Sequence, residues 1–163
     1  LKMKIQRFED IEAWQAAREL VKLVYKSISA NGKFQKDYRL MNQIQGAAVS
    51  TMANIAEGFS RQSNKEFIQY LFISKSSAAE VQSHLYVALD QEYIDKENFD
   101  NIYSQAEIVS KLDSGFIKYL RACLVTVYRR SGDGLPQTQS VAQKVCKYCA
   151  ENRINQVRLM SFV

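Results

Sequence analysis

The stretch AAVSTMANIAEGFSRQSNKEF, residues 47–67, decides the fold, because one helix ends within it and another begins. An apolar helical pattern runs as far as Gly58 and resumes after Ser63. Gly58 stands where a left-handed C-terminal cap is expected. Ser63 and Glu66 have the spacing of a capping box, in which the serine hydroxyl and the glutamate carboxylate each accept from a helix-end amide. The stretch therefore predicts two consecutive helices joined by a tight turn.

Apolar residues recur at helical spacing over the rest of the chain, and no stretch alternates with the period of a strand. They predict four helices, at about 10–30, 36–57, 64–92 and 96–130. With short connections, such helices form an antiparallel up-down-up-down bundle, so we predict an all-α four-helix bundle. The bundle is expected over residues 1–132, and a weakly helical or disordered tail over residues 133–163.

Each predicted helix has an apolar stripe that is expected to be buried. On the first helix the stripe is Trp14, Ala17, Val21, Val24 and Ile28. On the second it is Leu40, Ile44, Ala47, Thr51 and Ile55. On the third, a strict alternation of four and three residues gives Phe67, Leu71, Ser74, Ala78, Val81, Leu85 and Ala88. On the fourth it is Ile102, Ala106, Val109, Leu112, Phe116, Leu120, Cys123 and Val127. The alternation is typical of bundle helices that pack nearly parallel.

Composition restricts the class of protein further. The chain has 163 residues, with 47% apolar and 24% charged residues, which fits a globular domain. It has no 18-residue apolar run and no secretory pattern at the first residues, so we expect no membrane contact and a reducing, cytoplasmic setting. The net charge is +5, distributed as +4 over residues 1–40, −5 over 41–110 and +6 over 111–163, which indicates a polarised surface.

Two helical segments carry more apolar residues than one buried stripe needs. They are FIQYLFIS, residues 67–74, and YLRACLVTVY, residues 119–128. Ordinary exposure of a few apolar side chains is one interpretation. We favour contact with neighbouring subunits, because contiguous exposed apolar surface marks interfaces.

The residues capable of catalysis or metal binding are sparse. Glu80 and His84 lie four apart on one helix, but a di-iron bundle site requires two Glu-x-x-His motifs, and the chain has one His. Cys146 and Cys149 form a single C-x-x-C, interpreted as incidental cysteines, with an intersubunit metal or redox role as the alternative. Neither a phosphate loop nor a nucleophile elbow is present. We therefore expect no metal, no cofactor and no enzymatic activity.

The basic residues are better organised. Arg18, Lys22 and Lys26 are spaced by four along the first helix, and they are expected to face solvent. A second set lies on the fourth helix: Lys111, Lys118, Arg121, Arg129 and Arg130. If the first and fourth helices are neighbours, the two sets can merge into one surface that binds phosphate backbones, with Tyr119 and Tyr128 available to stack on bases. An ordinary solvated basic face is the alternative.

Four segments, residues 8–25, 38–61, 63–81 and 107–120, resemble the bacterial four-helix bundle family encoded by 23S rRNA intervening sequences, also called S23 ribosomal proteins. The stretch Asn-Ile-Ala-Glu-Gly, which follows Gln-x-x-x-Ala-Ala, carries the most specific part of the resemblance. The bundle fold is shared with the accessory protein of diversity-generating retroelements. The resemblance implies a non-enzymatic bundle that assembles as a ring, typically a pentamer. Its retroelement relatives bind nucleic acid and dock on a reverse transcriptase.

The resemblance also bears on Glu57, whose negative charge is unfavourable at the C-terminal end of a helix. It implies that Asn54 and Glu57 lie where the second helix ends beside the third. We interpret Glu57 as a structural tether for the turn at 58–63 rather than as a ligand site. Its candidate partners are Arg61, Gln43, Lys65 and the Ser63 amide.

The sequence thus predicts a ring-forming, nucleic-acid-binding accessory protein, with a reverse transcriptase as one candidate partner. The alternative is an intervening-sequence-encoded scaffold that binds protein and no nucleic acid.

Overall fold

The computed structural model describes residues 5–61 and 63–130, with side chains described as far as residue 122. The described part consists of helices, which are η1 (Phe8–Asp10), α1 (Glu12–Ala30), α2 (Gly32–Lys36), α3 (Tyr38–Ser60), α4 (Asn64–Asp90) and α5 (Lys96–Arg130). It contains no strand, so the all-α prediction is confirmed for these residues. The predicted tail at 133–163 lies outside the described residues, and the domain limits stay a prediction.

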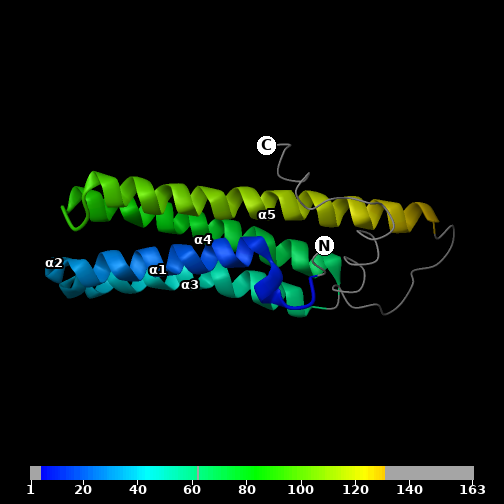
Figure 1. Ribbon diagram of the computed structural model, residues 1–163, viewed down its shortest axis with the longest axis horizontal. Coiled ribbons are helices and arrows are strands. Elements are labelled where there is room, and N and C mark those ends of the chain that lie inside the picture. Colours follow the sequence, from blue (N-terminus) through cyan, green and yellow to red (C-terminus); the bar gives the residue numbers. More distant parts are fainter. Residues whose placement is uncertain (1–4, 62, 131–163) are drawn as a thin grey trace.

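Four long helices form a bundle, in which α1, α3, α4 and α5 lie side by side along the long axis of the molecule (Figure 1). The short α2 sits at one end, and α5 extends beyond the other three helices at the opposite end (Figure 1). Around the bundle, α1 packs against α3 and α5, and α4 packs against the same two helices. None of the described helices combines the length and apolar character needed to span a bilayer.

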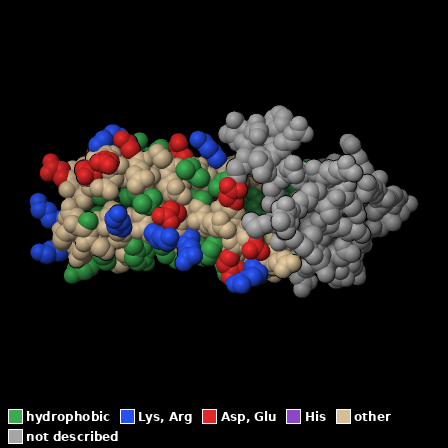
Figure 2. All heavy atoms as spheres, viewed as in Figure 1, with side chains coloured by type: hydrophobic (Ala, Val, Ile, Leu, Met, Phe, Trp, Pro, Cys, Tyr) green, Lys and Arg blue, Asp and Glu red, His purple; other side chains and the backbone are tan. Residues whose placement is uncertain are grey.

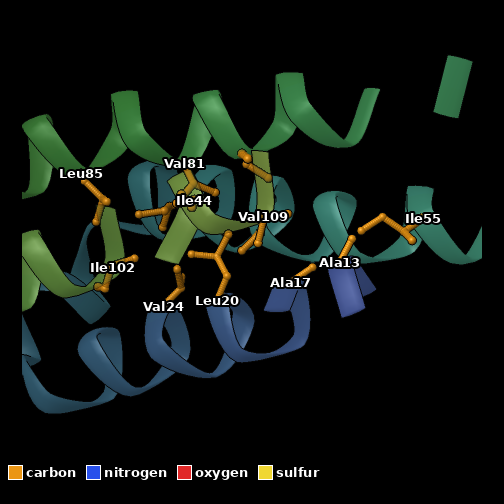
Figure 3. Close-up of a cluster of buried hydrophobic side chains, with 14 of the residues drawn as sticks. Ala13, Ala17, Leu20, Val24, Ile44, Ile55, Val81, Leu85, Ile102 and Val109 are labelled. Carbon is orange, nitrogen blue, oxygen red and sulfur yellow. The ribbon is translucent and has the colours of Figure 1, made fainter. Parts of the chain in front are cut away.

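The core lies along the inner faces of the four long helices (Figure 3). Every residue of the stripes predicted on α3 and α4 is buried. On α1 the buried face is rotated slightly from the prediction, because Ala13 and Leu20 are buried while Trp14 and Val21 are only partly buried. Trp14 instead packs edge-on against Phe8 of η1, with ring centroids 5.1 Å apart.

Side-chain caps set the ends of several helices. Asn31 ends α1 and begins α2, where its Oδ1 accepts from the Lys33 and Phe34 amides at 2.8 and 3.2 Å. At the start of α5, Asp95 Oδ1 accepts from the Asn98 amide at 2.8 Å. A polar side chain at such a position satisfies amides that have no partner within the helix.

The predicted capping box at the start of α4 is present in half. The Ser63 hydroxyl accepts from the Glu66 amide at 3.2 Å. The Glu66 carboxylate accepts from the Ser63 hydroxyl at 2.7 Å, whereas a full box would have it accept from the Ser63 amide.

Gly58 is a correction to the sequence analysis. It lies inside α3, which continues to Ser60, and its backbone is not left-handed. A Cβ atom at this position would lie 2.6 Å from Cδ2 of Phe67 and 2.7 Å from Cβ of Tyr70. Gly58 is therefore required because α4 approaches too closely for a side chain, not because a cap needs a positive φ.

We predict that Gly58→Ala destabilises the protein by about 1–3 kcal/mol, since the added methyl must push α3 and α4 apart. Gly115→Ala is the matched control, because a Cβ at Gly115 meets nothing within 4 Å. It should stabilise α5 by about 0.5–1 kcal/mol. Urea unfolding at constant m-value measures both changes, and equal effects at the two positions would contradict the packing explanation.

Candidate functional site

The turn between α3 and α4 holds a cluster of three side chains. Arg61 is hydrogen-bonded to both Glu57 and the Tyr70 hydroxyl, and that hydroxyl donates to Glu57 Oε1 at 2.9 Å. The Arg61 guanidinium also lies over the Tyr70 ring, 4.9 Å from its centroid. The Tyr70 hydrogen bond and then Arg61 hold the pKa of Glu57 below its ordinary value. The cluster joins the last turn of α3 to α4.

The structure places one of the predicted partners, Arg61, beside Glu57. Tyr70 was missed, because it lies on the next helix and no local spacing connects the two. The Glu57 side chain is 51% exposed, so this carboxylate is partnered at the surface rather than in the core. Asn54 does not join the cluster, because its amide donates to the Ser50 carbonyl and hydroxyl at 2.7 and 3.0 Å within α3.

The basic residues predicted on α1 are all exposed. Lys22 pairs with Glu19 at 2.9 Å, and the Arg18 guanidinium lies 5.9 Å from the centroid of the Trp14 ring. Lys26 lines an open groove of about 680 Å³ between the end of α1 and the start of α5. Glu92 and Asp95 line the same groove, so the field there is mixed rather than uniformly positive.

The basic residues predicted on α5 are exposed where their side chains are described. Lys111 lies 3.8 Å from Glu107, and the Arg121 guanidinium lies 5.4 Å from the centroid of the Phe72 ring on α4. Lys118 points to solvent without a charged partner among the described residues. Arg129 and Arg130 belong to the last turn of α5, and their side chains lie outside the described ones.

The described members of the two basic sets lie at different levels along the neighbouring helices α1 and α5. Asn31 Nδ2 donates to the Tyr93 carbonyl at 2.9 Å, and Gln105 Nε2 donates to the Ala16 carbonyl at 2.8 Å. Positions along α1 therefore pair with positions along α5 in opposite order. Arg18 and Lys111, the members nearest to each other along the axis, lie two and six residues to opposite sides of the Ala16–Gln105 contact, about 12 Å apart along the axis. This exceeds the Debye length of about 8 Å at physiological ionic strength.

The acidic residues are also unevenly distributed, and they lie beside the basic set of α1 rather than beside the distal basic residues of α5. Residues 92–107, beside the basic set of α1, contain five acidic residues and one basic residue. Residues 114–130 contain four basic residues and no acidic one. One face of the molecule accordingly shows basic and acidic side chains interspersed, with apolar side chains between them (Figure 2).

Tyr119 is a second correction. Its side chain is 6% exposed and packs near Phe116, so it is not available to stack on bases. The side chain of Tyr128 lies outside the described ones.

Glu80 and His84 make an ordinary polar contact at 3.5 Å on α4. In the described part of the chain, no group of three or more potential ligands lies close enough to hold a metal ion. Cys146 and Cys149 lie outside the described residues.

Comparison with known proteins identifies the family. The model of the 23S rRNA-intervening sequence protein family matches residues 9–115. This chain belongs to that family. A solved structure from Bacteroides thetaiotaomicron, described as a protein with unknown function from the S23 ribosomal protein family, is similar, with 28% identity and a TM-score of 0.59. The match covers 65% of this chain and 98% of that one. A search of curated proteins gave no match.

The region that matches the 23S rRNA-intervening sequence protein family divides the candidate residues. It includes the cluster at Glu57 and the basic set of α1, but on α5 it includes only Lys111 of the predicted basic residues. The distal basic half of α5 therefore lies outside the part of the chain that the family model covers.

We predict that Tyr70→Phe raises the pKa of Glu57, because the hydrogen bond that most favours the charged carboxylate is removed. A lowered pKa in the folded state contributes stability above the ordinary pKa of 4.5 and loses it as pH falls through the folded value. The variant should therefore differ from the parent more at pH 7 than at pH 3. NMR titration of the carboxyl checks the shift. Tyr86→Phe, which removes an exposed hydroxyl elsewhere on α4, should leave the Glu57 pKa unchanged.

Proposed function

We propose that this chain is a non-enzymatic bundle protein that assembles with copies of itself and holds RNA or DNA on its basic residues. In this proposal the bundle is antiparallel, up-down-up-down, and the copies form a ring, with five as the expected number. The observation that carries it is the distribution of charge along the sequence: α3 has no charged residue between Arg39 and Glu57, whereas every charged residue of segment 114–130 in α5 is basic.

The charge-free face supports self-assembly. Between Arg39 and Glu57 the sequence of α3 contains no charged residue. The solvent side of α3 exposes Val49 by 38%, and the adjoining α4 exposes Ile73 and Val87 by 47% and 44%. Glu80, whose side chain is 55% exposed, lies between these two on the same side of α4 and is the charged residue at the edge of this face. A helix side that lacks charge and exposes apolar atoms is the kind of surface that a second copy covers.

We predict that Ile73→Glu lowers the oligomer mass, since it places a charge in this face. Ile108→Glu is the matched control, because Ile108 on α5 is 45% exposed, against 47% for Ile73. Multi-angle light scattering after gel filtration measures the mass. The Ile108 variant should keep the parent mass, and a parent mass of one protomer at micromolar concentration would contradict the assembly.

The distal half of α5 supports polyanion binding. It extends past the other helices (Figure 1), and its residues 114–130 carry four positive charges without an acidic residue. Lysine and arginine at such a site release counterions when they meet phosphates, so binding weakens steeply with salt. Assembly would repeat the site and raise its avidity.

We predict that replacing Lys111, Lys118 and Arg121 together by Gln weakens binding to a single-stranded RNA probe at least about tenfold at low salt. It should also flatten the dependence of log K on log salt by roughly 0.7 for each phosphate that the variant no longer neutralises. Replacing Arg18, Lys22 and Lys26 by Gln gives the same change in net charge. Each triple contains one lysine that is paired within its own helix, Lys22 with Glu19 and Lys111 with Glu107. The α1 replacement should weaken binding less, because the acidic residues of the segment 92–107 lie beside it.

The second candidate function is a protein-binding scaffold without nucleic acid. The mixed charges beside the basic set of α1 favour it, because acidic neighbours repel phosphates. The same titration distinguishes the two, since a scaffold would show no salt-dependent RNA affinity in the parent protein. A reverse transcriptase as protein partner stays a prediction of the family resemblance, to be tested by co-purification of the two chains.

A further inference from the structure

Asp113 is a buried acidic residue in the middle of α5 that none of the surfaces described so far uses. It is fully buried, and neither of its carboxyl oxygens makes a hydrogen bond. Ser74 of α4 is also fully buried, and its hydroxyl has no hydrogen-bond partner. Isolated polar groups of this kind are costly in a bundle core, and a buried anion is the costliest.

The two groups face each other across the seam where α4 packs on α5. The Ser74 hydroxyl is close enough to influence the Asp113 carboxyl, although no hydrogen bond of normal geometry joins them. Lys75 of α4 is the one charged group among the described residues that also acts on Asp113. No charged group of α1 or α3 in the described part does so.

We propose that Asp113 and Ser74 form a pH-sensitive lock between α4 and α5. The lock is closed when the Asp113 carboxyl is protonated, because no charge is then buried in the seam. Loss of the proton leaves an anion in the core with one partly exposed lysine nearby. The seam then loosens, because water reaches the carboxylate only if the helices separate locally.

The direction of the pH dependence follows from burial. Burial raises the pKa of Asp113 from 3.8 to about 7, against smaller lowering effects of Ser74 and Lys75. The folded state therefore binds the proton more tightly than the unfolded chain does. The stabilisation is complete below about pH 4, declines as pH rises towards 7, and is absent above that value.

Asp113→Asn tests the lock, because it keeps the shape and removes the titration. The ratio of the unfolding constants of the parent and the variant should rise by up to roughly a thousandfold between pH 4 and pH 8, since each pKa unit corresponds to a factor of ten. Every other ionisable side chain is present in both proteins, so the ratio isolates the contribution of residue 113. Asp100→Asn, which removes an exposed carboxylate of the same helix, should give a ratio that changes little with pH.

Two measurements keep the proposal testable if Asp113→Asn fails to fold. NMR titration of the parent protein should place the Asp113 carboxyl near pH 7, and Ser74→Ala should move this midpoint higher, because the hydroxyl favours the charged form. Hydrogen exchange should show protection of the α5 amides around residue 113 falling between pH 5 and 8, after correction for intrinsic rates, while α3 stays protected. A midpoint near pH 4, or a parent-to-variant ratio independent of pH, would overturn the lock.

Discussion

The close approach of α3 and α4 at their shared turn is the contact on which the rest of the bundle depends. A three-residue connection forces the two helices together at this end, and Gly58 lets the backbone of α3 lie directly against Phe67 and Tyr70. Phe67 in turn packs edge-on against Phe116 of α5, with centroids 5.0 Å apart. The position of α5 therefore depends on the same turn. In a close-packed core, a shift of Phe67 would also displace Phe116 of α5.

The hydrogen-bonded cluster of Glu57, Arg61 and Tyr70 lies at the surface of the same turn and also links α3 to α4. Glu57 and Arg61 are roughly half exposed, so their pairing is screened by water and contributes little by itself. Tyr70 fixes the relative positions of the two charged side chains. Its ring packs against the Arg61 guanidinium, and its hydroxyl donates a hydrogen bond to Glu57. The carboxylate that looks misplaced at a helix end is held by a cation and a hydroxyl that face it from outside the helix end.

Periodicity in the sequence predicts most of the fold because a buried stripe is a property of a single helix. Every residue of the stripes that it predicts on α3 and α4 is buried, although Ala48 and Ile68 are buried outside these stripes. On α1 it placed the buried face slightly too far round the helix. Trp14 packs against Phe8, a contact that the helix pattern does not reveal. It missed Asp113 because a search for apolar residues passes over a buried carboxyl. It missed Tyr70 and misjudged Gly58 because both depend on the distance between two helices.

For the basic residues, the sequence shows which side of a helix they occupy but not their level along the bundle. That level is set by contacts such as Gln105 with Ala16.

The arrangement of the four helices links the proposed assembly to the proposed binding surface. Each of α1 and α4 packs against both α3 and α5, so α3 and α5 lie diagonally across the bundle. In a ring, the outer side of α3 in one copy meets a different face of the next copy, and this contact does not itself cover α5 of the first copy. Burying unpaired charge in an interface is costly, which is a reason for the charge-free sequence of α3 between Arg39 and Glu57. An interface on the distal half of α5, where the sequence predicts a subunit contact at residues 119–128, would bury basic residues without acidic partners of their own. In an assembly built on α3, these residues would remain exposed, and each added copy would contribute another basic helix end to the surface.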